Sequence, residues 1–147
     1  MKIRDIFIGL VLLALSGCDD EGTQFLTVSF PSDRASISED SPTPLTVTLK
    51  MNKKSKKQRF LFIEMSTTTA DLYESSFTSD KNFEPSSNSI TAIFPPNTTV
   101  YEFDIIPIDN NEQDGDKFLS LSLNFSNPEV KRGKYDTILI TIEDDDV

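Results

Sequence analysis

The sequence predicts an all-β fold, an antiparallel β-sandwich of about seven strands. Short segments in which apolar and polar residues alternate recur along the chain, which is the period of a strand with one buried face. Turn-forming residues separate these segments, and no segment keeps a helical period. β-branched and aromatic residues are frequent within the segments, as is typical of strands.

The expected strands follow one another from residue 26 onward. The first covers residues 26–30, is interrupted by Pro31, and continues over residues 35–38. Residues 45–51 show the clearest alternation, and an apolar run at residues 60–65 indicates a central strand. After a long polar segment, the last four strands are expected at residues 90–94, 100–108, 118–125 and 137–142.

The chain begins with the features of a secretory leader. Lys2 and Arg4 precede an apolar run at residues 6–15, and small residues follow it. The run is too short for a membrane-spanning helix, which needs about 20 residues. Leu15-Ser16-Gly17-Cys18 resembles the lipobox of bacterial lipoproteins, which implies cleavage before Cys18 and lipidation of that residue. The alternative is an ordinary cleaved leader with a chance cysteine.

We therefore expect a lipoprotein signal peptide at residues 1–17, an acidic tether with lipidated Cys18 at residues 18–24, and a sandwich domain at residues 25–147. The acids at residues 19–21 resemble a surface-export signal of some Gram-negative groups. In enteric bacteria an Asp at this place instead resembles an inner-membrane retention signal, and a solvated tether is a third interpretation. We expect anchoring in the cell envelope, with the outer membrane or the cell surface favoured.

Three groups of segments resemble the Calx-β family, which is named for sodium–calcium exchangers and also occurs in bacterial surface proteins. Their order and spacing are more specific than any one of them, and together they cover residues 26–146. The resemblance implies an immunoglobulin-like sandwich that binds calcium at one end in some members. The matching segments are 28–30 with 36–40, then 94–97 with 103–109 and 116–121, and finally 140–146.

The resemblance also implies a set of metal ligands. The sequence departs from the family at Asn110 and at Asn82, where the family usually has Asp, and its acidic loop is about one residue shorter. An asparagine still has a carbonyl oxygen for calcium, but each change removes a charge. The positions that match are Glu39, Asp109, Asp114, Asp116, Asp144, Asp145 and Asp146.

Two interpretations of these acids remain open. Ca²⁺ takes six to eight oxygen ligands and is the cofactor that such a cluster suits. Alternatively, the acids are solvated turns that keep the surface soluble. The chain has no histidine, and its single cysteine, Cys18, is assigned to the lipid, so zinc, iron and copper sites are not expected.

Composition disfavours two classes of function. The net charge of the whole chain is −10, which disfavours nucleic acid, because nucleic-acid binding depends on neutralising phosphates. Without a histidine or a glycine-rich phosphate loop, we do not expect an enzyme. Glu102 and Asp104 lie two residues apart on one expected strand, and we interpret them as a solvent-facing pair.

We predict a lipid-anchored extracytoplasmic module with a structural or adhesive binding role and calcium at its acidic end. The alternative is a glycan- or protein-binding accessory lipoprotein with no bound metal. Tryptophan is absent, and the aromatic residues lie mostly at core positions of the expected strands. Tyr73, Phe77 and Phe83 are exceptions in the long polar segment and could contact an unknown partner.

Strand direction sorts the charged residues. Because successive antiparallel strands reverse direction, Glu39, the loop at 109–116 and the tail at 144–146 should lie at one end. We expect the other end to receive the tether and to face an anionic membrane surface, where each basic residue contributes about 1 kcal/mol; the alternative is a solvated lysine turn. The basic residues expected there are Lys50, Lys53, Lys54, Lys56, Lys57, Arg59, Lys131, Arg132 and Lys134.

Overall fold

The computed structural model describes residues 25–67, 77–79, 88–126 and 128–146, and these form two five-stranded sheets. Sheet A has the strand order β5-β7-β3-β1-β9, and sheet B has the order β2-β10-β8-β4-β6. The strands are β1 (Leu26–Ser29), β2 (Arg34–Ser38), β3 (Leu45–Met51), β4 (Arg59–Thr67), β5 (Phe77–Ser79), β6 (Ser89–Phe94), β7 (Val100–Pro107), β8 (Lys117–Asn124), β9 (Val130–Arg132) and β10 (Thr137–Glu143).

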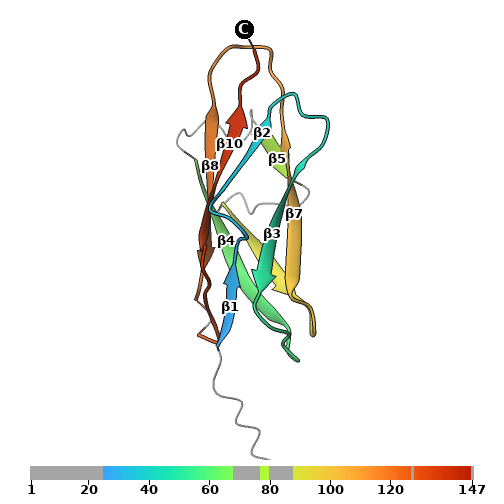
Figure 1. The fold of residues 1–147 in the computed structure, drawn as a ribbon, viewed down its shortest axis with the longest axis vertical. Helices are drawn as coiled ribbons and strands as arrows, with labels where there is room; N and C mark the ends of the chain where they lie inside the picture. Colours follow the sequence, from blue (N-terminus) through green and yellow to red (C-terminus); the bar gives the residue numbers. More distant parts are fainter. Residues whose placement is uncertain (1–24, 68–76, 80–87, 127, 147) are drawn as a thin grey trace, which may run out of the picture.

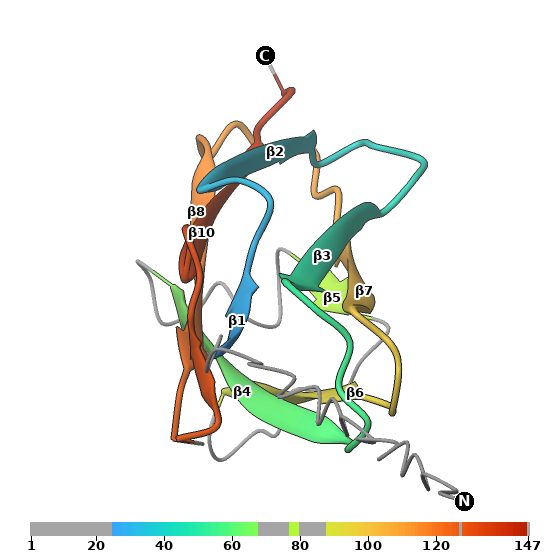
Figure 2. The same ribbon diagram turned by 60° about the horizontal axis from the view of Figure 1, so that its bottom comes forward.

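The two sheets pack face to face around one apolar core (Figures 1 and 2). The predicted β-sandwich is confirmed, and the alternation in the sequence is the alternation between core and solvent. In β8, for example, Leu119, Leu121 and Leu123 are buried, whereas the residues between them are partly exposed. The described part of the chain contains no helix with the length and hydropathy needed to cross a membrane.

Two strands change sheets halfway along the molecule. The chain runs from β1 in sheet A to β2 in sheet B, and likewise from β9 to β10. The two crossings lie side by side, because Phe30 N–H donates to Tyr135 O at 2.8 Å and Leu139 N–H donates to Asp33 O at 2.9 Å. As a result β1 pairs with β9, and β2 with β10, in parallel, which strict reversal of direction did not predict.

One face of β4 is exposed. β4 lies between β8 and β6, so its prediction as a central strand is confirmed. Only one side of sheet B meets sheet A, however, and Phe60 and Phe62 point outward beside Ile93 of β6, each more than a third exposed. Phe118 at the start of β8 is similarly exposed. The expectation that aromatic residues lie mostly at core positions is therefore wrong for these three phenylalanines.

The proposed aromatic contact residues are only partly described. Phe77 opens β5, where it pairs with Pro107 of β7, so the expectation that it lies outside any strand is wrong. Tyr73 and Phe83 lie outside the described residues. β5 adds a short edge strand to sheet A, next to residues 70–77, for which the sequence left open a helical turn or a short edge strand.

The two ends of the sandwich have opposite charge, as predicted. Figure 1 shows the start of β1 and the turn between β3 and β4 at the bottom, and the chain end with the β7–β8 loop at the top. Asn52 joins the lysine turn to β1, because its N–H donates to Thr27 O at 3.0 Å. Lys134 does not lie at the basic end as predicted. The chain continues from β9 in sheet A to β10 in sheet B, and Lys134 lies in this crossing, over the Tyr135 ring.

Gly133 allows the close approach of β9 to β1. Its N–H donates to Val28 O at 2.9 Å, and a Cβ at this position would lie 2.6 Å from Ser29 Cβ. We expect Gly133→Ala to lower the free energy of unfolding by about 1–3 kcal/mol through overpacking, measured by denaturant unfolding.

A double variant provides the control for this prediction. Ser29→Gly removes the two atoms that the new methyl group would approach most closely, so combining it with Gly133→Ala should cost less than the sum of the two single changes. Additive losses would show that the clash with Ser29 is not the cause.

Candidate metal centre

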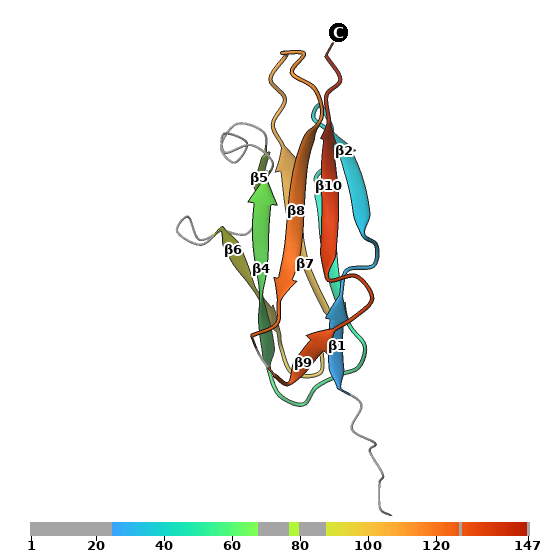
Figure 3. The ribbon, with the colours of Figure 1, turned by 90° about the vertical axis from the view of Figure 1, so that its left-hand side faces the viewer.

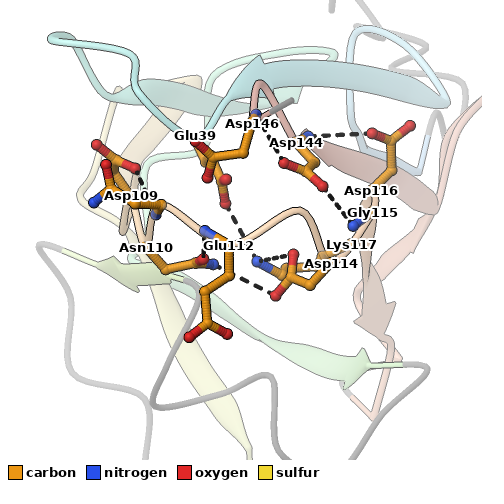
Figure 4. Close-up of polar contacts among 11 residues, drawn as sticks. Glu39, Asp109, Asn110, Glu112, Asp114, Gly115, Asp116, Lys117, Asp144 and Asp146 are labelled. Atoms are coloured by element: carbon orange, nitrogen blue, oxygen red, sulfur yellow. Dashed lines mark hydrogen bonds and ion pairs between the residues drawn. The ribbon is translucent and has the colours of Figure 1, made fainter.

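Three segments meet at the acidic end of the sandwich (Figure 4). Glu39 follows β2, residues 108–116 connect β7 to β8, and residues 144–146 follow β10. The parallel pairing of β2 with β10 continues one residue past β2, because Glu39 N–H donates to the O atom of Glu143, the last residue of β10, at 3.0 Å. This bond holds residue 39 directly beside the acidic tail.

Three carboxylates converge there. One oxygen from each of Glu39, Asp144 and Asp146 lies within 4.8 Å of the others. Calcium–oxygen bonds are about 2.3–2.6 Å long, so two oxygens on opposite sides of one ion are separated by about 5 Å. The spacing of the three oxygens therefore fits a single bound cation, and this set is called the acidic trio below.

Two oxygens of the trio are buried without a partner. Glu39 is only 2% exposed, which is rare for a glutamate. Glu39 Oε1 and Asp146 Oδ2 have no hydrogen-bond donor within the described part of the chain. A buried, unpartnered carboxylate oxygen costs free energy because it has lost its water. A cation between these oxygens would remove that cost.

Lys117 neutralises part of the cluster. Its Nζ lies 3.2 Å from Glu39 Oε2 and 2.9 Å from Asp114 Oδ1, and the lysine side chain is itself largely buried. The sequence pattern had not indicated a role for this residue. Its position directly after Asp116, at the start of the strand that leaves the acidic end, is the pattern that could have identified it.

Asp144 fastens the loop to the tail. Its carboxylate accepts hydrogen bonds from Gly115 N–H at 2.5 Å and from Asp146 N–H at 3.0 Å. Gly115 has φ +80°, a conformation that favours glycine. Asp116 in turn accepts from Asp144 N–H at 3.2 Å, and its carboxylate points away from the trio in Figure 4. Asp116 thus braces the tail without joining the cluster.

Asn110, which departs from the family pattern, directs its side chain into the loop to which it belongs. Asn110 Oδ1 accepts from Glu112 N–H at 2.7 Å, and Asn110 Nδ2 lies 3.4 Å from Asp114 Oδ2. Its carbonyl oxygen is therefore engaged in the loop. Asn82, the other departure, lies outside the described residues.

The structure brings together some of the seven predicted ligands and separates others. Glu39, Asp144 and Asp146 form the trio, and Asp109 and Asp114 flank it closely enough to perturb it electrostatically. Asp116 faces away, and Asp145 is exposed and lies outside the trio.

The electrostatics of the trio favour a cation. Burial raises the pKa of the Glu39 carboxyl, against the effect of the hydrogen bond from Lys117. Burial and the charge of Asp109 likewise raise the pKa of Asp146. The N–H groups of Gly115 and Asp146 hold the pKa of Asp144 below its ordinary value. The ionised forms of Glu39 and Asp146 are thus less stable here than in water, and a divalent cation bound between them would stabilise those ionised forms.

The lysine responds to the same surroundings. Burial acts to lower the pKa of Lys117, but its hydrogen bonds to Asp114 and Glu39 outweigh burial and the pKa is raised. The lysine therefore remains a positive charge within the acidic end. Glu39 uses Oε2 for this bond, so Oε1 stays available to a second cation.

Comparisons with known proteins agree with the fold. No protein-family model and no curated protein sequence matches the chain. Among solved structures, the apo form of the Calx CBD1 domain superposes with a TM-score of 0.67 at 19% identity, covering 84% of this chain and 100% of that one. CBD12 from CALX1.2 gives 0.66 at 18% identity, covering 82% of this chain and 46% of that chain.

A third structure, the calcium binding domain CBD12 of CALX1.1, has a TM-score of 0.65 at 18% identity and covers 81% of this chain. This chain spans 46% of that structure, as it does of CBD12 from CALX1.2. The predicted Calx-β-like sandwich is thereby confirmed as a fold.

The buried pair of Lys117 and Glu39 gives a test of the site's construction. Lys117→Met should lower the free energy of unfolding by about 3 kcal/mol, because it leaves the Glu39 carboxylate buried without its cation. Lys54→Met, at an exposed lysine, should change it by no more than about 0.5 kcal/mol. Denaturant unfolding in the presence of a chelator measures both.

The double variant Lys117→Met with Glu39→Gln should lose less stability than the two single changes add up to, because the buried side chain at position 39 then carries no charge that needs Lys117. Equal losses for Lys117→Met and Lys54→Met would show that the pair contributes nothing.

Proposed function

We propose that this chain is a lipid-anchored, extracytoplasmic binding module of the Calx-β type, with a structural or adhesive role, and that calcium binds at its acidic end. The supporting observation is Glu39: a carboxylate that is almost fully buried, with Oε1 unpartnered, facing Asp144 and Asp146. An acidic surface by itself needs no metal, but a buried carboxylate oxygen without a donor does need a positive partner.

Each residue of the trio would contribute one oxygen ligand to the ion. Glu39 Oε1 and Asp146 Oδ2 are the oxygens without a partner, and Asp144 contributes the third oxygen of the trio. Asp109 and Asp114 lie near enough to supply further oxygens or to hold water, which calcium accepts in its shell of six to eight ligands. Calcium supplies the positive charge, and these side chains supply the oxygens and the geometry.

Binding at this place would connect parts of the chain that are far apart in sequence. Glu39 follows β2, Asp146 follows β10, and Asp114 belongs to the loop that joins β7 in sheet A to β8 in sheet B. An ion shared by these residues would lock both sheets together at one end. The likeness to a structure described as a calcium binding domain supports this proposal by analogy of fold.

We infer a binding role and not an enzymatic one. The chain has no histidine for general base catalysis, and two carboxylates of the acidic end are already committed to Lys117. The proposed anchor at Cys18 would hold the module in the cell envelope, at the outer membrane or the cell surface, with a protein or a glycan as its partner.

One observation favours the alternative of a partner-binding lipoprotein without metal. Phe60, Phe62 and Ile93 form an exposed apolar group on the outer face of sheet B, and the two phenylalanine rings pack edge to face. Exposed apolar groups of this kind often mark a protein contact. The dependence of the melting temperature on calcium distinguishes a calcium-binding module from one without metal.

Melting temperature should depend on calcium. If the ion binds only the folded chain, a hundredfold excess over its dissociation constant stabilises that state by about 2.7 kcal/mol. Melting should therefore rise in calcium and fall in chelator. Asp146→Asn should abolish most of the rise, because it removes the charge next to an unpartnered oxygen.

Two matched variants make this test specific. Glu112 lies in the same loop with its carboxylate pointing away from the trio, so Glu112→Gln should keep the full response to calcium. Asp145→Asn should lose less of the response than Asp146→Asn, since Asp145 lies outside the trio. Identical melting in calcium and chelator would instead support solvated carboxylates and the alternative function.

Lipid anchoring has its own test. Cys18→Ser removes the only thiol of the chain, so the protein should no longer incorporate a labelled fatty acid and should leave the detergent phase in a partition experiment. Ser16→Ala, which keeps the cysteine and a small residue before it, should remain labelled. Fatty-acid labelling that persists in Cys18→Ser would rule out this anchor.

A further inference from the structure

The basic end of the sandwich has an open hollow of about 700 Å³ beside the start of β1. Its walls are both apolar and cationic: Phe25, Phe125, Pro128, Val130, Lys131 and Arg132. Phe25 is 51% exposed although it is one of the largest apolar residues in the chain. A hollow with this lining has the chemistry of a membrane interface, where amphipathic groups are stable.

The cations of the hollow lie on its aromatic rings. Lys131 Nζ is 3.2 Å from the centroid of the Phe25 ring, and Arg132 Cζ is 5.5 Å from that of Phe125. Arg132 also pairs with Asp136, so its charge is partly balanced. Lys131 makes no ion pair with another described residue, and its ammonium group remains available to an anion.

More lysines lie beside the hollow. The turn between β3 and β4 contains four exposed lysines, and Asn52 at its start is bonded to the first residues of the sandwich: its Nδ2 donates to Phe25 O at 3.3 Å, and its Oδ1 accepts from Thr27 N–H at 2.9 Å. The basic turn and Phe25 are therefore held at the same end. The four lysines are Lys53, Lys54, Lys56 and Lys57.

The proposed lipid anchor would bring this end to a membrane. Cys18 precedes Phe25 by seven residues, which span at most about 25 Å when fully extended. Figure 3 shows β9 and the start of β1 together at the bottom of the molecule, far from the chain end at the top. A domain held by so short a tether would have its basic end, where β1 starts, facing the bilayer.

We propose that this basic end is a docking face for anionic phospholipid, in which the lysines bind headgroup phosphates and Phe25 enters the interface between headgroups and acyl chains. The orientation rests on the lipid anchor proposed above, whereas the contact chemistry does not. The whole chain has a net charge of −10, so general attraction to an anionic surface cannot produce such binding; only the segregated basic end can. The docked molecule presents its acidic end away from the membrane.

The test uses the mature chain, residues 18–147, with Cys18→Ser so that no acyl group contributes. Every buried core residue lies between Val28 and Ile142, so the leader supplies nothing to the described sandwich. Co-sedimentation is measured with vesicles of phosphatidylcholine, alone or mixed with phosphatidylglycerol. A chelator is present, because calcium would itself bridge carboxylates to phosphates.

The chain should sediment with the phosphatidylglycerol vesicles, not with phosphatidylcholine alone, and salt should release it. Lys54→Gln and Lys131→Gln should each weaken binding about fivefold. Phe25→Ala should weaken it as well. Lys134→Gln is the matched control: it removes the same charge from the crossing between β9 and β10, where Lys134 lies over Tyr135 and near Asp33, and should leave binding unchanged.

Two results would overturn the docking face. One is equal binding to both kinds of vesicle, and the other is an equal loss for Lys134→Gln and Lys131→Gln. Melting curves of the variants exclude unfolding as the cause of any loss. Because the chain is unacylated, failure here leaves the result of fatty-acid labelling at Cys18 intact, so the two proposals can fail separately.

Discussion

The arrangement of the molecule depends on two strands that change sheets side by side. β1 continues into β2 and β9 into β10, and the backbone groups of the two crossings bond to each other. Neither crossing therefore leaves these polar groups unpaired between two apolar sheets. The β2–β10 ladder ends in the bond from Glu39 N–H to Glu143 O, and it is this ladder that carries a buried carboxylate into contact with the acidic tail.

Much of the fold could be predicted because alternation is a local property. The strand at Leu45–Met51 and the last strand appear almost as expected. Local alternation does not say which strands are neighbours, so the parallel pairs and the short β9 were not foreseen. It also does not say whether an apolar run has one covered face or two, which is why Phe60 and Phe62 were placed wrongly.

The candidate site was predictable as a region but not as a set of atoms. Reversal of strand direction was sufficient to bring Glu39, the β7–β8 loop and the tail to one end. Which carboxylates converge depends on bonds between segments, such as that from Gly115 N–H to Asp144. Lys117 was missed for the same reason: its partner Glu39 is 78 residues away in the sequence.

The position of β1 also determines how the domain bears a mechanical load. β1 is an inner strand, held on one side by β3 and on the other by β9. Tension applied at Phe25 toward the basic end acts along the strand, at right angles to the antiparallel hydrogen bonds with β3. Those bonds are then sheared together and not opened one after another, so extraction of the first strand requires the concerted rupture of its ladders. A domain built in this way resists being pulled apart by force applied at the start of β1.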